Sequence, residues 1–122
     1  MGALIGKRCA NFLLSNLDLK INRTILWVDA LTILQWLNST NVLPQFIKNR
    51  ISEIKSMTNL TIRFVQGSDN PADIATRGMS ADLLRSEKKW WKGPEWLCHE
   101  TLWPAIPANA RRVQWTDRYP PY

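Results

Sequence analysis

The segment Thr24-Ile-Leu-Trp-Val-Asp29 decides the fold of this 122-residue chain. Its apolar run is short, continuous and rich in β-forming residues, a pattern that predicts a strand covered on both faces of a sheet. The run ends sharply at Asp29, and residues 30 to 37 resume helical spacing. We therefore expect a buried strand that runs directly into a helix.

A second strand is predicted at Leu60-Thr-Ile-Arg-Phe-Val65, where apolar and more polar residues alternate as in an edge strand with one wetter face. The loop Gly67-Ser-Asp-Asn70 follows it. Asn70 is a good N-cap with Pro71 at the first helical position, so a helix should run from Pro71 to about Arg77 and stop at Gly78.

Two further helices complete the pattern before residue 78. The first covers residues 3 to 17, and the second runs from Pro44 to about Met57. The first places its apolar residues on one face: Ile5, Cys9, Phe12, Leu13 and Leu17. The order helix, strand, helix, helix, strand, helix predicts an α/β fold with two parallel neighbouring strands. Because a sheet normally needs at least three strands for independent stability, a missing portion is expected.

The character of the chain changes after Gly78. Residues 80 to 87 suit one more short helix, whereas Trp, Pro and Arg dominate from Trp90 onward without a sustained period. We divide the chain into a domain over 1–78, a Trp-rich connector over 79–104 and an unplaced tail over 105–122. In the connector, three tryptophans alternate with three lysines, a mixture that suits either packing or base stacking with phosphate contact. These residues are Trp90, Trp91, Trp96, Lys88, Lys89 and Lys92.

Composition gives a broader indication of partners. Sixteen basic and ten acidic residues give a net charge of +6 and a pI near 9.8, which favours nucleic acid as a partner, with simple solubility as the alternative. No stretch is apolar enough for a membrane span or a secretory signal. Cys9 and Cys98 lack metal or redox spacing, so reduced thiols in a cytoplasmic or nuclear protein are expected.

Asp29 and Asp73 are the candidate catalytic and metal-binding residues. Each follows one of the two predicted strands, and carboxylates from the ends of adjacent parallel strands can converge on one divalent cation. The alternative is local, because Asp29 can cap the next helix and Asp73 can satisfy the first turn of its own. Hydrolysis by two metal ions usually takes three or four carboxylates, and no convincing third ligand is found.

These residues carry a resemblance to a known family. Ile25-Leu-Trp-Val-Asp29 with Ile33-Leu-Gln-Trp-Leu37, and then Phe64-Val-Gln-Gly-Ser-Asp-Asn-Pro-Ala-Asp-Ile-Ala-Thr-Arg-Gly78, resemble the BEL/Pao retrotransposon polyprotein. The segment Trp90-Trp-Lys-Gly-Pro-Glu-Trp-Leu97 also resembles that family, between its ribonuclease-H-like region and its integrase. The resemblance covers roughly residues 2 to 104.

The resemblance implies a partial ribonuclease H-like fold and a Mg²⁺-dependent endoribonuclease in the intact parent. Asp29 and Asp73 match the third and fourth of its four carboxylates, and the other two would lie upstream of Met1. Ala30 stands where the family usually has Ser. We therefore expect this chain to be noncatalytic by itself. The resemblance also implies that the first strand here has lost a neighbour, so self-association through that bare edge is expected.

Two other hypotheses remain open. The chain can be a noncatalytic binding module that holds RNA/DNA hybrid or DNA nonspecifically through Lys48, Arg50 and Lys55 on one helix. It can also be a decayed open reading frame without a selected function. The sequence does not separate these two.

Overall fold

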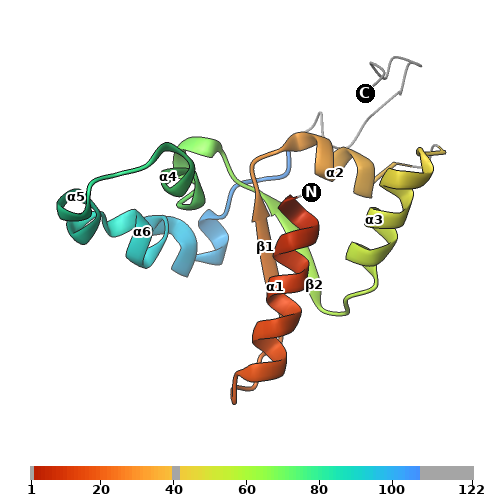
Figure 1. Ribbon diagram of the computed structural model, residues 1–122, viewed down its shortest axis with the longest axis horizontal. Helices are drawn as coiled ribbons and strands as arrows, with labels where there is room; N and C mark the ends of the chain where they lie inside the picture. Colours follow the sequence, from red (N-terminus) through yellow and green to blue (C-terminus); the bar gives the residue numbers. More distant parts are fainter. Residues whose placement is uncertain (1, 40–41, 108–122) are drawn as a thin grey trace.

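The computed structural model describes residues 2–39 and 42–107, and it shows a mixed α/β chain built around a small parallel sheet (Figure 1). In chain order the helices and strands are α1 (Gly2–Asn16), β1 (Thr24–Val28), α2 (Leu31–Leu37), α3 (Gln45–Lys55), β2 (Leu60–Phe64), α4 (Ala72–Arg77), α5 (Ala81–Ser86) and α6 (Lys88–Lys92). Three short 3-10 helices are η1 (Gly67–Asp69), η2 (Glu95–Cys98) and η3 (Glu100–Leu102). The predicted order of elements is confirmed as far as residue 78.

The two strands are parallel neighbours, as predicted, with Thr24 opposite Leu60 and Val28 opposite Phe64. The ladder begins with a bond from the N–H of Thr24 to the carbonyl of Asn59. It ends with a bond of 2.9 Å from the N–H of Val65 to the carbonyl of Val28. The carboxyl ends of both strands therefore lie side by side at one end of the sheet, where the candidate site lies.

One face of the sheet is covered by helices. Ala3 and Leu4 of α1 and Ile54 of α3 form its buried centre, against which the strand residues Leu26, Val28, Leu60 and Ile62 pack. Helix α3 buries a regular stripe of Ile47, Ile51 and Ile54, as its spacing requires. This aliphatic layer is the hydrophobic core of the chain.

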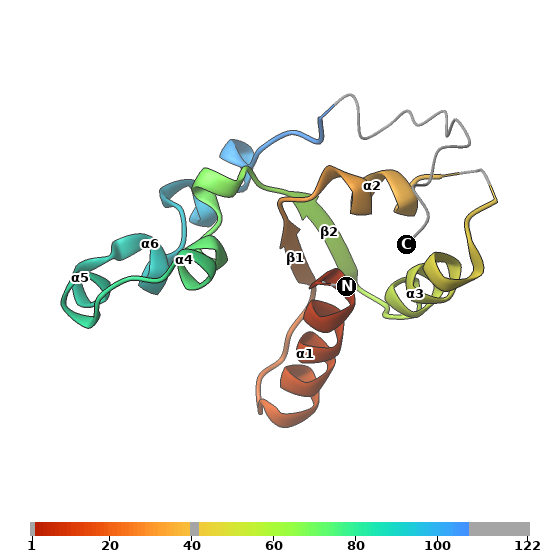
Figure 2. The same ribbon diagram turned by 45° about the horizontal axis from the view of Figure 1, so that its top comes forward.

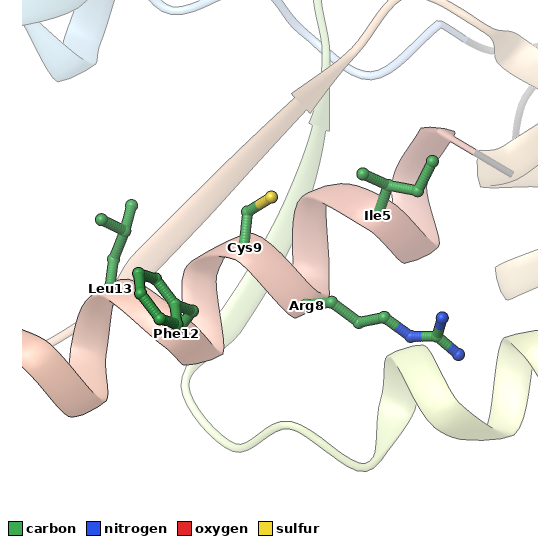
Figure 3. A pocket seen from close by; sticks show the side chains of 5 residues that line it. All are labelled: Ile5, Arg8, Cys9, Phe12 and Leu13. Carbon is green, nitrogen blue, oxygen red and sulfur yellow. The ribbon is translucent and has the colours of Figure 1, made fainter.

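Helix α1 turns an unexpected face toward the sheet. Its apolar stripe is exposed, since 53% of Ile5 and 67% of Phe12 face solvent, whereas Lys7 is buried. Figure 3 shows Ile5, Cys9 and Leu13 on the outside of the helix, while Arg8 points toward α3. Gly6 explains this orientation. A Cβ at this position would lie 2.7 Å from the side chain of Leu26, so only glycine lets the helix approach the sheet this closely. The face that α1 turns to the sheet therefore carries Gly6 and the buried residues Ala3, Leu4 and Lys7.

The opposite face of the sheet is covered by the connector. Trp27 of β1 contacts both Trp96 and Trp103 edge-to-face, with ring centroids 5.0 Å and 5.2 Å apart. Arg63, opposite Trp27 in register, lies over the ring of Trp103 and donates to the carbonyl of Pro104. Trp96 therefore has the packing role that was one of the two expectations for the connector tryptophans, and η2 and η3 cover this face of the sheet.

Helices α4, α5 and α6 extend to one side of the sheet, away from α3, in both views (Figures 1 and 2). Gly78 ends α4 with a φ of +79°, a backbone conformation that favours glycine. The predicted short helix over residues 80 to 87 is confirmed as α5, which Ser80 caps by accepting from the N–H of Leu83. Most of the unplaced tail, from residue 108 on, lies outside the described residues.

The outer edge of β1 has no strand partner within residues 2–39 and 42–107. Thr24, Leu26 and Val28 point their backbone groups toward β2, so those of Ile25 and Trp27 point the other way.

None of the described helices is long and apolar enough to cross a membrane.

Candidate functional site

Asp29 stands at the carboxyl end of β1, where the last ladder bond has been made and the chain turns into α2. Its side chain does not cap that helix, because α2 begins at Leu31 and the N-cap residue is Ala30, which makes no side-chain capping bond. The carboxylate instead turns toward the loop that follows β2. The capping role considered for Asp29 is therefore not the one that this structure shows.

Asn70 connects the two strand ends. Its amide Nδ2 donates to Asp29 Oδ2 over 3.2 Å, and its backbone carbonyl accepts from the N–H of Asp73 over 3.1 Å. Its Oδ1 also accepts from the N–H of Ala72, which is the N-cap contact expected of this residue. Gly67 lies behind the carboxylate, since a Cβ there would be 3.9 Å from Asp29 Oδ2. One asparagine thus links Asp29 to the start of α4.

Asp73 lies in the first turn of α4 and is half-buried. Its Oδ2 accepts from Arg77 over 3.1 Å, and its Oδ1 accepts from the Thr76 hydroxyl over 3.2 Å. Both oxygens are engaged by side chains of its own helix, and not by the backbone N–H groups that the local alternative named. An exposed pair of this kind contributes at most about 1 kcal/mol, so a stronger ligand can displace Arg77.

The oxygen chemistry of Asp29 and Asp73 suits a hard divalent cation such as Mg²⁺. Within the described ranges, however, no three His, Cys, Asp or Glu side chains gather closely enough to hold a metal ion. Hydrolysis by two ions calls for three or four carboxylates, so Asp29 and Asp73 alone do not supply enough ligands for such a site.

The three basic residues proposed for nucleic-acid contact all lie on α3, but they do not share one face. Lys48 and Lys55 are exposed and seven residues apart, which places them on the same side of the helix. Arg50 lies nearly opposite and folds back onto its own helix, with its guanidinium over the ring of Phe46 and a bond to the Phe46 carbonyl.

The sequence interpretation identified Asn70 only as a helix cap and missed its contact with Asp29. The available signal was its position, since an asparagine before a proline in a loop at a strand end commonly turns its side chain to local backbone groups. It likewise missed Lys89, whose Nζ donates to the carbonyl of Ser68 over 2.6 Å and so fastens α6 to the same loop. Comparison with models of known protein families, with curated proteins and with solved structures finds no match to this chain.

Proposed function

We propose that this chain is the carboxyl-terminal part of a ribonuclease H-like domain of a BEL/Pao-type retrotransposon polyprotein, and that it is noncatalytic without the rest of that domain. In the intact parent the domain would degrade the RNA strand of RNA/DNA hybrids. The observation that carries the proposal is the joining of Asp29 to the start of α4 through Asn70, at the common end of two parallel strands. Ligand sites of open α/β sheets lie at that end.

The bare outer edge of β1 supports the proposal that a further part of the domain is needed. Ile25 and Trp27 present their backbone groups there without a strand partner among the described residues. Both faces of β1 are covered, by helices on one side and by tryptophans on the other. A strand that is covered on both faces is typical of the middle of a sheet, where it has a neighbour on each side.

In the complete domain Asp29 and Asp73 would hold Mg²⁺ together with carboxylates from the upstream part. The ion would supply charge stabilisation for the attacking and leaving oxygens of the phosphodiester. Asn70 holds the Asp29 carboxylate toward the loop, which fixes the orientation of one ligand. Arg77 would leave Asp73 when a cation binds, and it would then be free to contact phosphate.

The second candidate function is nonspecific nucleic-acid binding without cleavage. Lys48 and Lys55 favour it, because both are exposed on one side of α3 and the chain has a net charge of +6. The two candidates differ in one respect, since binding through lysines depends on salt but not on Asp29.

The test is cleavage of a labelled RNA/DNA hybrid by a chain extended upstream through the missing strands, in the presence of Mg²⁺. We expect the extended chain to cleave, the Asp29→Asn variant to lose cleavage while retaining hybrid binding, and the present chain to be inactive. Asp18→Asn is the matched control, because Asp18 is exposed and lies just after α1, in the segment that leads to the amino end of β1. Equal cleavage by Asp29→Asn would show the assignment to be wrong. Salt-sensitive binding without cleavage by every form would favour the second candidate.

A further inference from the structure

Helix α6 presents an exposed face that combines an indole with two ammonium groups. Residues three and four apart are neighbours on a helix, so Lys88 lies beside both Trp91 and Lys92. All three are exposed, and Trp91 has 65% of its surface in solvent. We call Lys88, Trp91 and Lys92 the α6 face.

The ring of Trp91 is held in place although it is exposed. Its Nε1 donates to the backbone carbonyl of Leu84 in α5 over 2.8 Å, so the polar edge of the indole is satisfied within the chain. Trp96 and Trp103 are instead half-buried and pack edge-to-face against Trp27. Trp91 is thus an oriented, solvent-facing aromatic surface for which none of the described residues provides a ring partner.

The charges beside this ring are available. Lys89 points away from the α6 face to the carbonyl of Ser68, whereas no ion pair within residues 2–39 and 42–107 involves Lys88 or Lys92. Helix α6 contains no acidic residue, and Glu87 and Asp82 are the acidic residues just before it. A polyanion on this face would meet two free lysines next to the indole.

We propose that the α6 face binds single-stranded nucleic acid, with an unpaired base stacked on Trp91 and the flanking phosphates contacted by Lys88 and Lys92. A stacking aromatic with adjacent basic groups is the chemistry by which proteins hold single strands without reading their sequence. Bases in a duplex are stacked on each other and do not offer a face to the indole. The inference rests on α6 alone and does not depend on Asp29 or Asp73.

A lipid surface is the other ligand with affinity for tryptophan and lysine, but the geometry disfavours it. Helices that lie in a membrane interface separate a broad apolar face from a charged one. Here the lysines share the face of Trp91, the more exposed of the two α6 rings, and α6 spans only Lys88–Lys92. Lysines beside a ring suit a strand of alternating bases and phosphates better than a bilayer.

The experiment measures binding of a short fluorescein-labelled oligothymidylate to the full chain by fluorescence anisotropy at several salt concentrations. We expect Trp91→Ala to raise the Kd roughly 5- to 100-fold, the range that loss of one stacked base produces. Trp91→Phe keeps an aromatic ring for stacking, so it should retain most of the affinity even though it loses the N–H bond to Leu84. The double variant Lys88→Gln/Lys92→Gln should lower the slope of log Kd against log salt by about 1.4, since two phosphate contacts are removed.

The control is Lys20→Gln, which removes an exposed positive charge from the segment between α1 and β1. It should leave the effect of Trp91→Ala unchanged. The proposal is overturned if Trp91→Ala binds the oligonucleotide as the wild type does, or if a duplex of the same length competes as well as the single strand. It is also overturned if anionic phospholipid vesicles bind through Trp91 while the oligonucleotide does not. Failure of hybrid cleavage in the extended chain would leave this result unaffected.

Discussion

The two faces of the β1–β2 sheet are covered in different ways. On one face, aliphatic side chains of α1 and α3 pack against Leu26 and Ile62. On the other face, Trp27 contacts Trp96 and Trp103, and Arg63 lies over the ring of Trp103. Arg23 also makes a bidentate salt bridge with Glu100, 77 residues further along the chain. The first face is made by elements close in sequence and the second by a segment that returns from far away.

The two faces differ in the kind of contact that holds them, and this difference shows that the connector belongs to the folded part of the chain. Aliphatic packing is nondirectional and depends mainly on the area that is buried. The tryptophan face depends in addition on directed contacts, such as the bond of 2.8 Å from Trp103 Nε1 to the Leu97 carbonyl. The connector therefore stabilises the sheet as a second layer, and the contributions of the two layers can be measured separately.

The largest effect is expected on the helix face. Ile54 is 4% exposed and belongs to the central cluster, so Ile54→Ala should lower the free energy of unfolding by about 2–5 kcal/mol. Urea denaturation of dilute protein, followed by tryptophan fluorescence, measures this change. Lys55→Ala, at the next and exposed position of the same helix, is the control and should change little. Equal effects of the two substitutions would mean that the aliphatic layer is not the core.

A smaller effect is expected on the tryptophan face. Trp96→Ala removes an edge-to-face contact with Trp27 from a half-buried site, so it should cost about 1–3 kcal/mol. It should also speed proteolysis of the connector. Trp91→Ala is the matched control, because Trp91 is mostly exposed and makes no ring contact with Trp27 among the described residues. If Trp96→Ala leaves both readouts at the values of the control, the connector is a linker after all.

The smallest effect is expected from acidification. Arg23, through its hydrogen bonds and its charge, holds the pKa of Glu100 below the usual 4.5. Since this pKa is lower in the folded state, the pair stabilises the fold above the unfolded pKa, and this contribution is lost as pH falls through the folded pKa. Glu100→Gln should therefore reduce the urea midpoint near neutral pH and have no effect at pH values well below 4.5.

Glu53→Gln is the control for that measurement. Arg8 holds the pKa of Glu53 below its usual value in the same way, but this pair joins α1 to α3 on the helix face. Both substitutions should lose their effect in acid, whereas only Glu100→Gln should speed cleavage of the connector by protease. An effect of Glu100→Gln that persists in acid would exclude the salt bridge as its cause.

The local elements were predictable because their signals are local. The strand over 24–28 with its end at Asp29 and the stop at Gly78 follow from neighbouring residues. The parallel pairing follows from the order of the elements along the chain. The buried face of α1 was not predictable, because hydrophobic spacing identified Ile5 and Phe12 while the face that meets the sheet is the one that carries Gly6. Periodicity describes a helix without describing the surface that it meets.

The site was predictable in the same uneven way. The positions of Asp29 and Asp73 after the strands followed from the pattern, but their partners Asn70 and Arg77 depend on how the loop and α4 turn. The tryptophan layer was hidden for a different reason. Trp27 and Trp103 are brought together by tertiary packing across most of the chain, and short 3-10 segments leave no sustained period in sequence.

The distance in sequence between Trp27 and Trp103 also sets the order in which the chain acquires its structure. Pairs this far apart form slowly, because a long loop must close before the contact is made. During synthesis α1 and α3 can pack against the sheet once α3 and β2 have emerged, whereas the indole of Trp27 is covered only after η2 and η3 have emerged. Until then Trp27 and Arg63 face water on the side of the sheet that η2 and η3 later cover, and apolar surface exposed in this way promotes aggregation.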